Sequence, residues 1–336
     1  MKKILLASTA IVGFAGAASA AEITLSGYAE IGIFGGDDVE TQFHNDWQVN
    51  FNFSGTTDNG LEFGGKVQIE ENNSPSSTNG GLSIDDEAFW VSGAFGKVTL
   101  GETDGAYDWA LSEIYTGTSI FDDHSTHAGA YWFTGLDGAY DNQIIRYEYS
   151  FGDFAVAISA EQDDGRTVTA SSATISGVPV TTIRTIFNSG RPTLDTIWSI
   201  GGKWSGNMNG VDLSAGVGYQ SGENADTWGL SGSAGFSNGM SVALGYADFS
   251  FGSNDSSWWG IGVAYTPTTM PALTVGANYG AYDLGTSNDP SGFGLVANYD
   301  LGGGAVAMAG YGSSNKGVSF NGNGEDTFSL GLGLSF

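Results

Sequence analysis

Large apolar residues alternate with small or polar ones along most of the chain. At its C-terminal end, Phe328, Leu330, Leu332, Leu334 and Phe336 are separated only by Ser and Gly. A period of two places all the large side chains on one face of a β-strand. The chain therefore ends on a strand with one apolar face and one face of small residues.

The same alternation recurs in sixteen segments, most of them ten to thirteen residues long. A ten-residue strand rises about 33 Å, so at a tilt of about 40° it spans about 25 Å, the apolar height of an outer-membrane barrel. The pattern predicts one all-β domain over residues 21–336. The segments are 22–34, 45–56, 60–71, 84–94, 97–103, 142–151, 153–161, 195–205, 210–220, 226–237, 239–249, 256–266, 272–282, 291–300, 304–312 and 325–336.

The connections alternate between short and long, as an even-stranded barrel with both termini on one side requires. Short ones carry turn residues such as Asp58-Asn59-Gly60, because Gly and Asn tolerate the positive φ of tight hairpins. Residues 162–194 contain a further alternating run, which predicts either an external hairpin or an added strand pair. The longer connections are 35–44, 72–83, 104–141, 162–194, 221–225, 250–255, 283–290 and 313–324.

The first twenty residues have the features of a signal peptide. Lys2 and Lys3 precede an uncharged apolar stretch, and Ala18-Ser19-Ala20 is a small-residue cleavage site. The apolar stretch is too short to span a bilayer as a helix. We therefore expect residues 1–20 to be removed on export from the cytoplasm.

Composition narrows the class of protein further. There is no cysteine, so an exported chain of this size is held together without disulfides. Removing Lys2 and Lys3 leaves 8 basic residues against 37 acidic ones, a formal charge of −29. Nucleic acid is therefore excluded as a partner, since phosphate contacts need basic side chains.

Three stretches resemble general bacterial porins of the alphaproteobacterial type: Ser54 to Gly64, Ser92 to Val98 and Tyr299 to Gly304. The resemblance implies a 16-stranded antiparallel transmembrane β-barrel with the third external loop folded into the lumen. It also implies a homotrimer in outer-membrane lipid and lipopolysaccharide, through which ions and small hydrophilic solutes diffuse passively. Phe336 resembles the terminal signal that the outer-membrane assembly machinery reads.

The loop at residues 104–141 follows the fifth predicted strand, where the resemblance places the inward loop; we call it the constriction loop. It has seven acids and no Lys or Arg, and it also carries many large apolar residues, among them Trp109, Phe121 and Trp132. These favour a loop packed on the inner wall with its acids towards the channel, over a solvated acidic loop. The candidate constriction acids are Asp104, Asp108, Glu113, Asp122 and Asp123.

The predicted lumen face carries few basic residues and several acids. The basic ones are Lys66, Arg146 and Lys203, and Arg146 lies two residues from Glu148, a possible ion-pair partner. A net negative pore is expected to prefer cations. No cofactor is required, but calcium at Asp122 and Asp123 is an alternative to plain repulsive charge, because Ca²⁺ takes several oxygen ligands.

Enzyme motifs are weak. Residues 235–239 match a nucleophile elbow formally but fall in a predicted hairpin. The three histidines, His44, His124 and His127, fall in predicted connections. We expect no enzyme; the alternatives are a substrate-specific channel of the same fold, or a barrel acting as an adhesin or surface hydrolase.

Four small residues of the first strands predict a trimer seam: Gly27, Ala29, Gly65 and Gly93.

Overall fold

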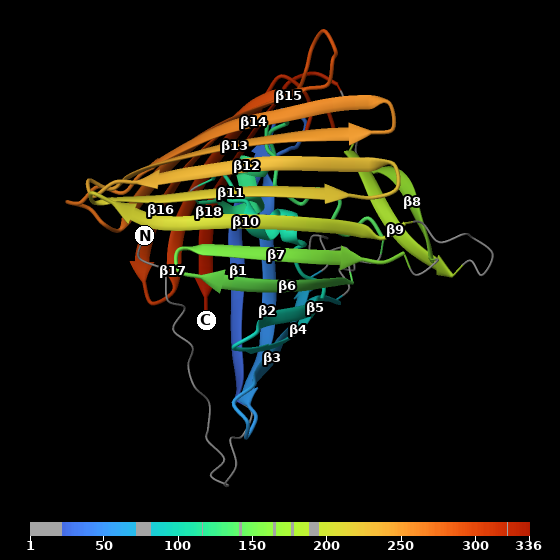
Figure 1. Cartoon of the computed structure of the whole chain (residues 1–336). Coiled ribbons are helices and arrows are strands. Elements are labelled where there is room, and N and C mark those ends of the chain that lie inside the picture. The colour runs from blue at the N-terminus through green and yellow to red at the C-terminus, as the bar shows by residue number, and fades with distance from the viewer. Residues whose placement is uncertain are drawn as a thin grey trace.

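Sixteen strands close into one barrel in which every strand is antiparallel to both neighbours (Figure 1). This computed structural model describes residues 22–71, 82–115, 117–140, 143–163, 166–175, 178–187, 195–320 and 322–336. The predicted signal peptide and most of the connection 72–83 lie outside these residues. The barrel strands are β1 (Glu22–Gly36), β2 (Gln42–Thr56), β3 (Glu62–Glu71), β4 (Leu82–Gly93), β5 (Gly96–Gly101), β6 (Ile144–Phe151), β7 (Phe154–Glu161), β10 (Ile197–Met208), β11 (Val211–Ser221), β12 (Ala225–Gly235), β13 (Met240–Phe251), β14 (Asn254–Tyr265), β15 (Leu273–Asp283), β16 (Ser291–Gly302), β17 (Ala305–Ser314) and β18 (Glu325–Ser335).

The prediction of a sixteen-stranded antiparallel barrel is confirmed, and each predicted segment overlaps one barrel strand. The alternating run inside 162–194 forms two further strands, β8 (Arg166–Ile175) and β9 (Val178–Phe187). They pair only with each other in a two-stranded sheet. Figure 1 shows this yellow-green hairpin projecting at one end of the barrel. The run therefore builds an external hairpin and adds no strand to the barrel.

The two ends of the chain meet at the barrel seam. Strand β18 pairs with β1 from Tyr28↔Ser335 to Gly36↔Thr327. Beyond the last paired strand residue, the Gly27 N–H donates to the Phe336 carbonyl at 2.7 Å and the Phe336 N–H donates to the Gly27 carbonyl at 3.0 Å. Phe336 therefore extends the ladder between β18 and β1 that closes the sheet.

The period of two separates the outside of the barrel from its inside. On β10, Trp198 and Ile200 are 61% and 57% exposed, whereas Ser199 between them is 6% exposed. The large apolar side chains point outward, where a bilayer would cover them. The small and polar ones point inward. The buried apolar core lies inside the barrel, around Tyr107, Phe133 and Trp258.

The connections differ from expectation in two places. The predicted loop 250–255 is a two-residue turn, Gly252–Ser253, because β13 and β14 extend to Phe251 and from Asn254. His44 lies inside β2 and not in a connection, because that strand begins at Gln42. No helix among the described residues is long and apolar enough to cross a bilayer.

Candidate functional site

The constriction loop packs against the inner wall of the barrel. Its helix α1 (Ala106–Ala110) contacts β7, β10 and β11, and its 3₁₀ segment η2 (Ile120–Ser125) contacts β1, β16, β17 and β18. The loop therefore passes along the wall from β7 round to the seam at β1. This placement confirms the third external loop as the one folded into the lumen.

Glycines on the inner wall let the loop backbone approach the strands. A Cβ added at Gly201, Gly216, Gly262 or Gly280 would lie only 1.7 to 2.0 Å from a loop carbonyl oxygen. Glycine is the residue that permits such an approach of two backbones. The high glycine content predicted small residues in the strands, but their role as a seat for the loop appears only in the folded barrel. The carbonyls belong to Ala106, Ala110, Ile114 and Gly129.

Polar side chains of the wall fix the loop by accepting or donating single hydrogen bonds. Ser159 on β7 accepts from the Ala106 N–H at 2.8 Å, and Ser231 on β12 accepts from the Ser112 N–H at 2.8 Å. The Trp258 indole on β14 donates to the Gly129 carbonyl at 2.9 Å. These bonds satisfy loop groups that packing on the wall removes from water.

The apolar side chains of the loop form a core with the wall. Tyr107, Ile114 and Phe133 are fully buried together with Trp258 and Ala247 of the strands. The Phe133 and Trp258 rings meet edge to face at 5.7 Å. The prediction that the loop aromatics pack on the inner wall is therefore confirmed for Tyr131 and Phe133, whereas Trp132 is 43% exposed.

The five candidate acids do not all face the channel. Asp104 and Asp122 are exposed, whereas Asp123 is 0% exposed. The expectation that the loop presents its acids to the channel is wrong for Asp123, because its carboxylate packs against Gly310 on β17. Glu113 is half-buried and accepts a hydrogen bond from the Phe133 N–H at 2.9 Å.

Burial changes the ionisation of these acids. It raises the pKa of Glu113 to about 8, with a smaller contribution from the charge of Asp108. It also raises the pKa of Asp108 to about 7, and the nearby charges of Asp104 and Asp137 act in the same direction. The pKa of Asp123 rises to about 6 for the same reason, loss of water. At neutral pH the loop thus carries less negative charge than its composition suggests.

Calcium binding at Asp122 and Asp123 stays a prediction, which the positions of the two side chains do not favour. Their side chains differ in environment, since Asp122 is exposed to the lumen and Asp123 is buried on the wall. Among the described residues, no group of three or more His, Cys, Asp or Glu side chains is arranged to hold a metal ion. Ca²⁺ also prefers six to eight oxygen ligands.

Three basic side chains share one recess of about 360 Å³ on the inner wall: Lys66 on β3, Lys97 on β5 and Arg146 on β6. Lys97 was missed from the sequence, although its alternation with Val98 placed it on the same face. Each has an acidic partner. Lys66 pairs with Asp86, and both Lys97 and Arg146 lie 3.3 Å from Glu148.

Lys203 on β10 binds the start of the loop, beside this recess. Its ammonium lies 3.7 Å from the centre of the Trp109 ring and donates to the Trp109 carbonyl at 2.9 Å. Arg146 lies 6.0 Å from the same ring and donates to the Thr103 hydroxyl at 3.3 Å. The structure therefore brings Lys66, Lys97, Arg146 and Lys203 to one side of the lumen, where two of them touch the loop.

The two loop histidines are structural in character. His124 and His127 are 2% and 1% exposed, and His127 Nε2 lies 2.8 Å from the Asn278 amide oxygen. Burial lowers the pKa of both to about 4, so both are neutral at pH 7. Neither has the exposed position that a hydrolase would need for reaching an external substrate.

Comparison with known proteins agrees with this architecture. A family model described as Gram-negative porin matches residues 7–318. The chain belongs to the Gram-negative porin family. A porin of Rhodobacter capsulatus is 29% identical over 319 residues, which cover 86% of this chain and 93% of that one. The fold of the present chain also matches solved porin structures.

A porin structure refined at 1.8 Å resolution has a TM-score of 0.68 at 24% identity, and covers 94% of this chain and 100% of its own. A triple mutant of the Rhodopseudomonas blastica porin has a TM-score of 0.66 at 18% identity with the same coverage. At these identities the structures show the shared fold. Porins of this family are channel proteins, and in this chain the loop lies inside the barrel.

Proposed function

We propose that this porin is an outer-membrane channel for ions and small hydrophilic solutes that prefers cations to anions. The observation that carries the preference is the position of the constriction loop. Asp104 and Asp122 of the loop are exposed, and the loop sequence has no Lys or Arg, which supports a negative lumen. Acidic side chains in a pore favour cation passage.

The basic wall does not reverse this preference. Asp86 pairs with Lys66, and Glu148 lies beside both Lys97 and Arg146. Lys203 is held against Trp109. The wall cations therefore have acidic or aromatic partners, while Asp104 and Asp122 are exposed. Without the predicted signal peptide the chain has a formal charge of −29, which favours a cation preference as well.

Reversal potentials test this proposal. Purified porin in a planar bilayer under a tenfold KCl gradient is expected to give the sign of a cation-preferring pore. The preference is expected to increase from pH 6 to pH 8, because the pKa of Asp108 lies at about 7 and that of Glu113 at about 8. A reversal potential of the anion-preferring sign would contradict the proposal. Saturable block by one solute would favour a substrate-specific channel.

We further propose export through the signal peptide of residues 1–20 and assembly as a homotrimer in contact with lipopolysaccharide. Family membership and the apolar outer face support an outer-membrane location. The small outward residues give less support to the predicted trimer seam, since rings of the same chain cover two of them. The Phe336 ring lies over Gly27, and the Phe53 and Phe89 rings lie over Gly65. Native mass spectrometry in detergent would establish the number of subunits.

A further inference from the structure

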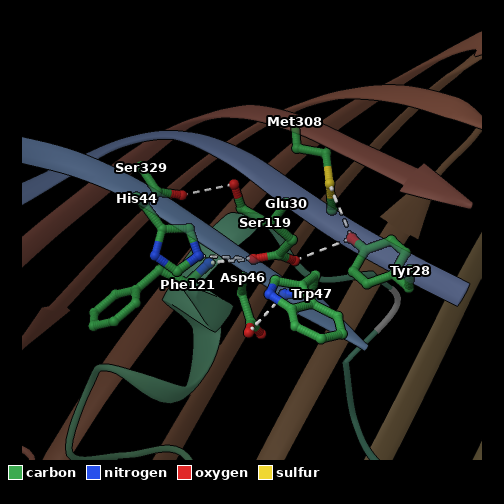
Figure 2. A network of polar contacts seen from close by, with 9 residues as sticks. All are labelled: Tyr28, Glu30, His44, Asp46, Trp47, Ser119, Phe121, Met308 and Ser329. Atoms are coloured by element: carbon green, nitrogen blue, oxygen red, sulfur yellow. Dashed lines mark hydrogen bonds and ion pairs between the residues drawn. The ribbon is translucent and has the colours of Figure 1, made fainter. Parts of the chain in front are cut away.

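We call the segment from Ser119 to Asp122 the tip of the constriction loop. One buried carboxylate attaches it to the first two strands (Figure 2). Glu30 on β1 is 8% exposed and has three hydrogen-bond partners. Its Oε1 accepts from the Tyr28 hydroxyl at 3.0 Å, and its Oε2 accepts from the Phe121 N–H at 3.1 Å. His44 Nε2 on β2 lies 3.1 Å from the same Oε2. One side chain therefore joins two strands and the loop.

The loop needs this attachment because its local backbone is unfavourable. Phe121 and Asp122 have φ values of 57° and 44°, in the left-handed region that residues with a Cβ avoid. The Phe121 ring stacks on Phe34 of β1, with centres 4.0 Å apart and planes at 15°, and the His44 ring meets its edge at 5.4 Å. Contacts with the wall thus hold a turn that local preferences oppose.

A second contact fixes the other side of the tip. The Ser119 and Ser329 hydroxyls lie 2.7 Å apart, and Ser329 is on β18. The tip therefore bridges the seam, from β18 to β1 and β2. Asp122, the exposed acid of this turn, follows Phe121 directly. Any movement of Phe121 changes the position of Asp122 in the lumen.

We propose that Glu30, supported by His44, is the positioning residue that holds the tip of the constriction loop against the wall and so keeps the pore at its full open width. This inference rests on the proposed channel function. It concerns how long the channel stays in its open state, and it does not depend on which ions the channel prefers.

The test compares Glu30→Gln with a matched control, Glu62→Gln. Both remove one negative charge from the lumen face, but Glu62 on β3 contacts Ser92 and not the loop. In Glu30→Gln, the amide oxygen takes the place of Oε2 without its charge, so the bond from the Phe121 N–H changes from charge-assisted to neutral and weakens. Single-channel recording is expected to show a roughly tenfold increase in the fraction of time spent in sub-conductance states, the factor that one lost charge-assisted hydrogen bond implies. Glu62→Gln is expected to be as quiet as the wild type.

A disulfide separates positioning from charge. The chain has no cysteine, and the Ser119 and Ser329 side chains meet with their oxygens 2.7 Å apart, so the pair chosen for a disulfide is Ser119→Cys with Ser329→Cys. In the Glu30→Gln background, oxidation of this cysteine pair is expected to return the time spent in sub-conductance states to the wild-type level, which gives quiet openings. Reduction of the disulfide is expected to reverse this. A barrel that is quiet with Glu30→Gln alone, or still noisy when oxidised, would overturn the inference.

Two further results keep the test decisive. If Glu30→Gln does not assemble, His44→Ala, which removes one partner of Glu30 and the edge contact with Phe121, is expected to show the same increase in closures. Quiet openings of His44→Ala would then count against the inference. A wild-type protein without conductance would instead refute the proposed function, so the two failures are distinguishable.

Discussion

Replacing Gly201 on β10 by alanine tests whether the inner wall is shaped to seat the constriction loop. The new Cβ would lie 1.9 Å from the Ala106 carbonyl oxygen and 2.6 Å from the Ala110 Cβ, where real contacts are no shorter than 3.0 Å. Helix α1 must therefore move away from the wall by about 1 Å, and overpacking of this kind costs about 1–3 kcal/mol. The shift also weakens the 2.8 Å bond from the Ala106 N–H to Ser159.

Gly202, the next residue, is the matched control. A Cβ added at Gly202 would point outward, and the nearest atom to it would be 4.0 Å away. Alanine is at least as favourable as glycine in a strand. We expect Gly201→Ala to lower single-channel conductance, because α1 moves into the lumen, and to lower the temperature at which the folded band disappears in gels of unheated and heated samples. Gly202→Ala is expected to leave both unchanged. Equal conductance and equal thermal stability of the two variants would refute the reasoning.

Three other predictions concern the loop and the seam. Glu113→Gln is expected to match the wild type in thermal stability at pH 5 and to exceed it at pH 9. The pKa of Glu113 is raised by burial to about 8, so the stability it contributes is present at low pH and is lost as pH rises through that value. If thermal melts give the same difference in melting temperature between variant and wild type at pH 5 and pH 9, this prediction is wrong. Deleting Phe336 removes both backbone bonds to Gly27, and the yield of folded barrel on refolding in detergent is expected to fall well below that of Phe336→Tyr. Lys203→Met removes the ammonium over Trp109, which costs about 1 kcal/mol of loop attachment, and is expected to increase the cation preference measured from reversal potentials; a shift towards anions would argue against a role for Lys203 in the lumen.

Much of the fold was predictable because its signal is local. The alternation around Trp198, Ser199 and Ile200 assigns an outer and an inner face within a few residues, and the strand it predicts is present. Turn residues such as Gly60, which has a positive φ, marked the hairpins for the same reason. The composition of residues 104–141 also indicated a loop that is both acidic and packed.

The ionisation and the contacts of the loop were not predictable in this way. Whether Asp123 faces the channel or the wall depends on the turn at Phe121 and on Gly310, which is nearly two hundred residues away in the chain. Lys97 joins Lys66 and Arg146 only because β3, β5 and β6 lie round one recess. The link from Glu30 to His44 and Phe121 likewise needs three separate segments.

The sequence by itself determined the strands, their outward and inward faces and the hairpin turns, because each depends on residues that are neighbours in the chain. The position of the inward loop was what the family resemblance implied. The tertiary structure alone decided which wall glycines seat the loop, which acids lose water and become harder to ionise, and which carboxylate holds the loop tip. These depend on closing the barrel, which brings β1 against β18 and places the loop between walls that the sequence keeps far apart.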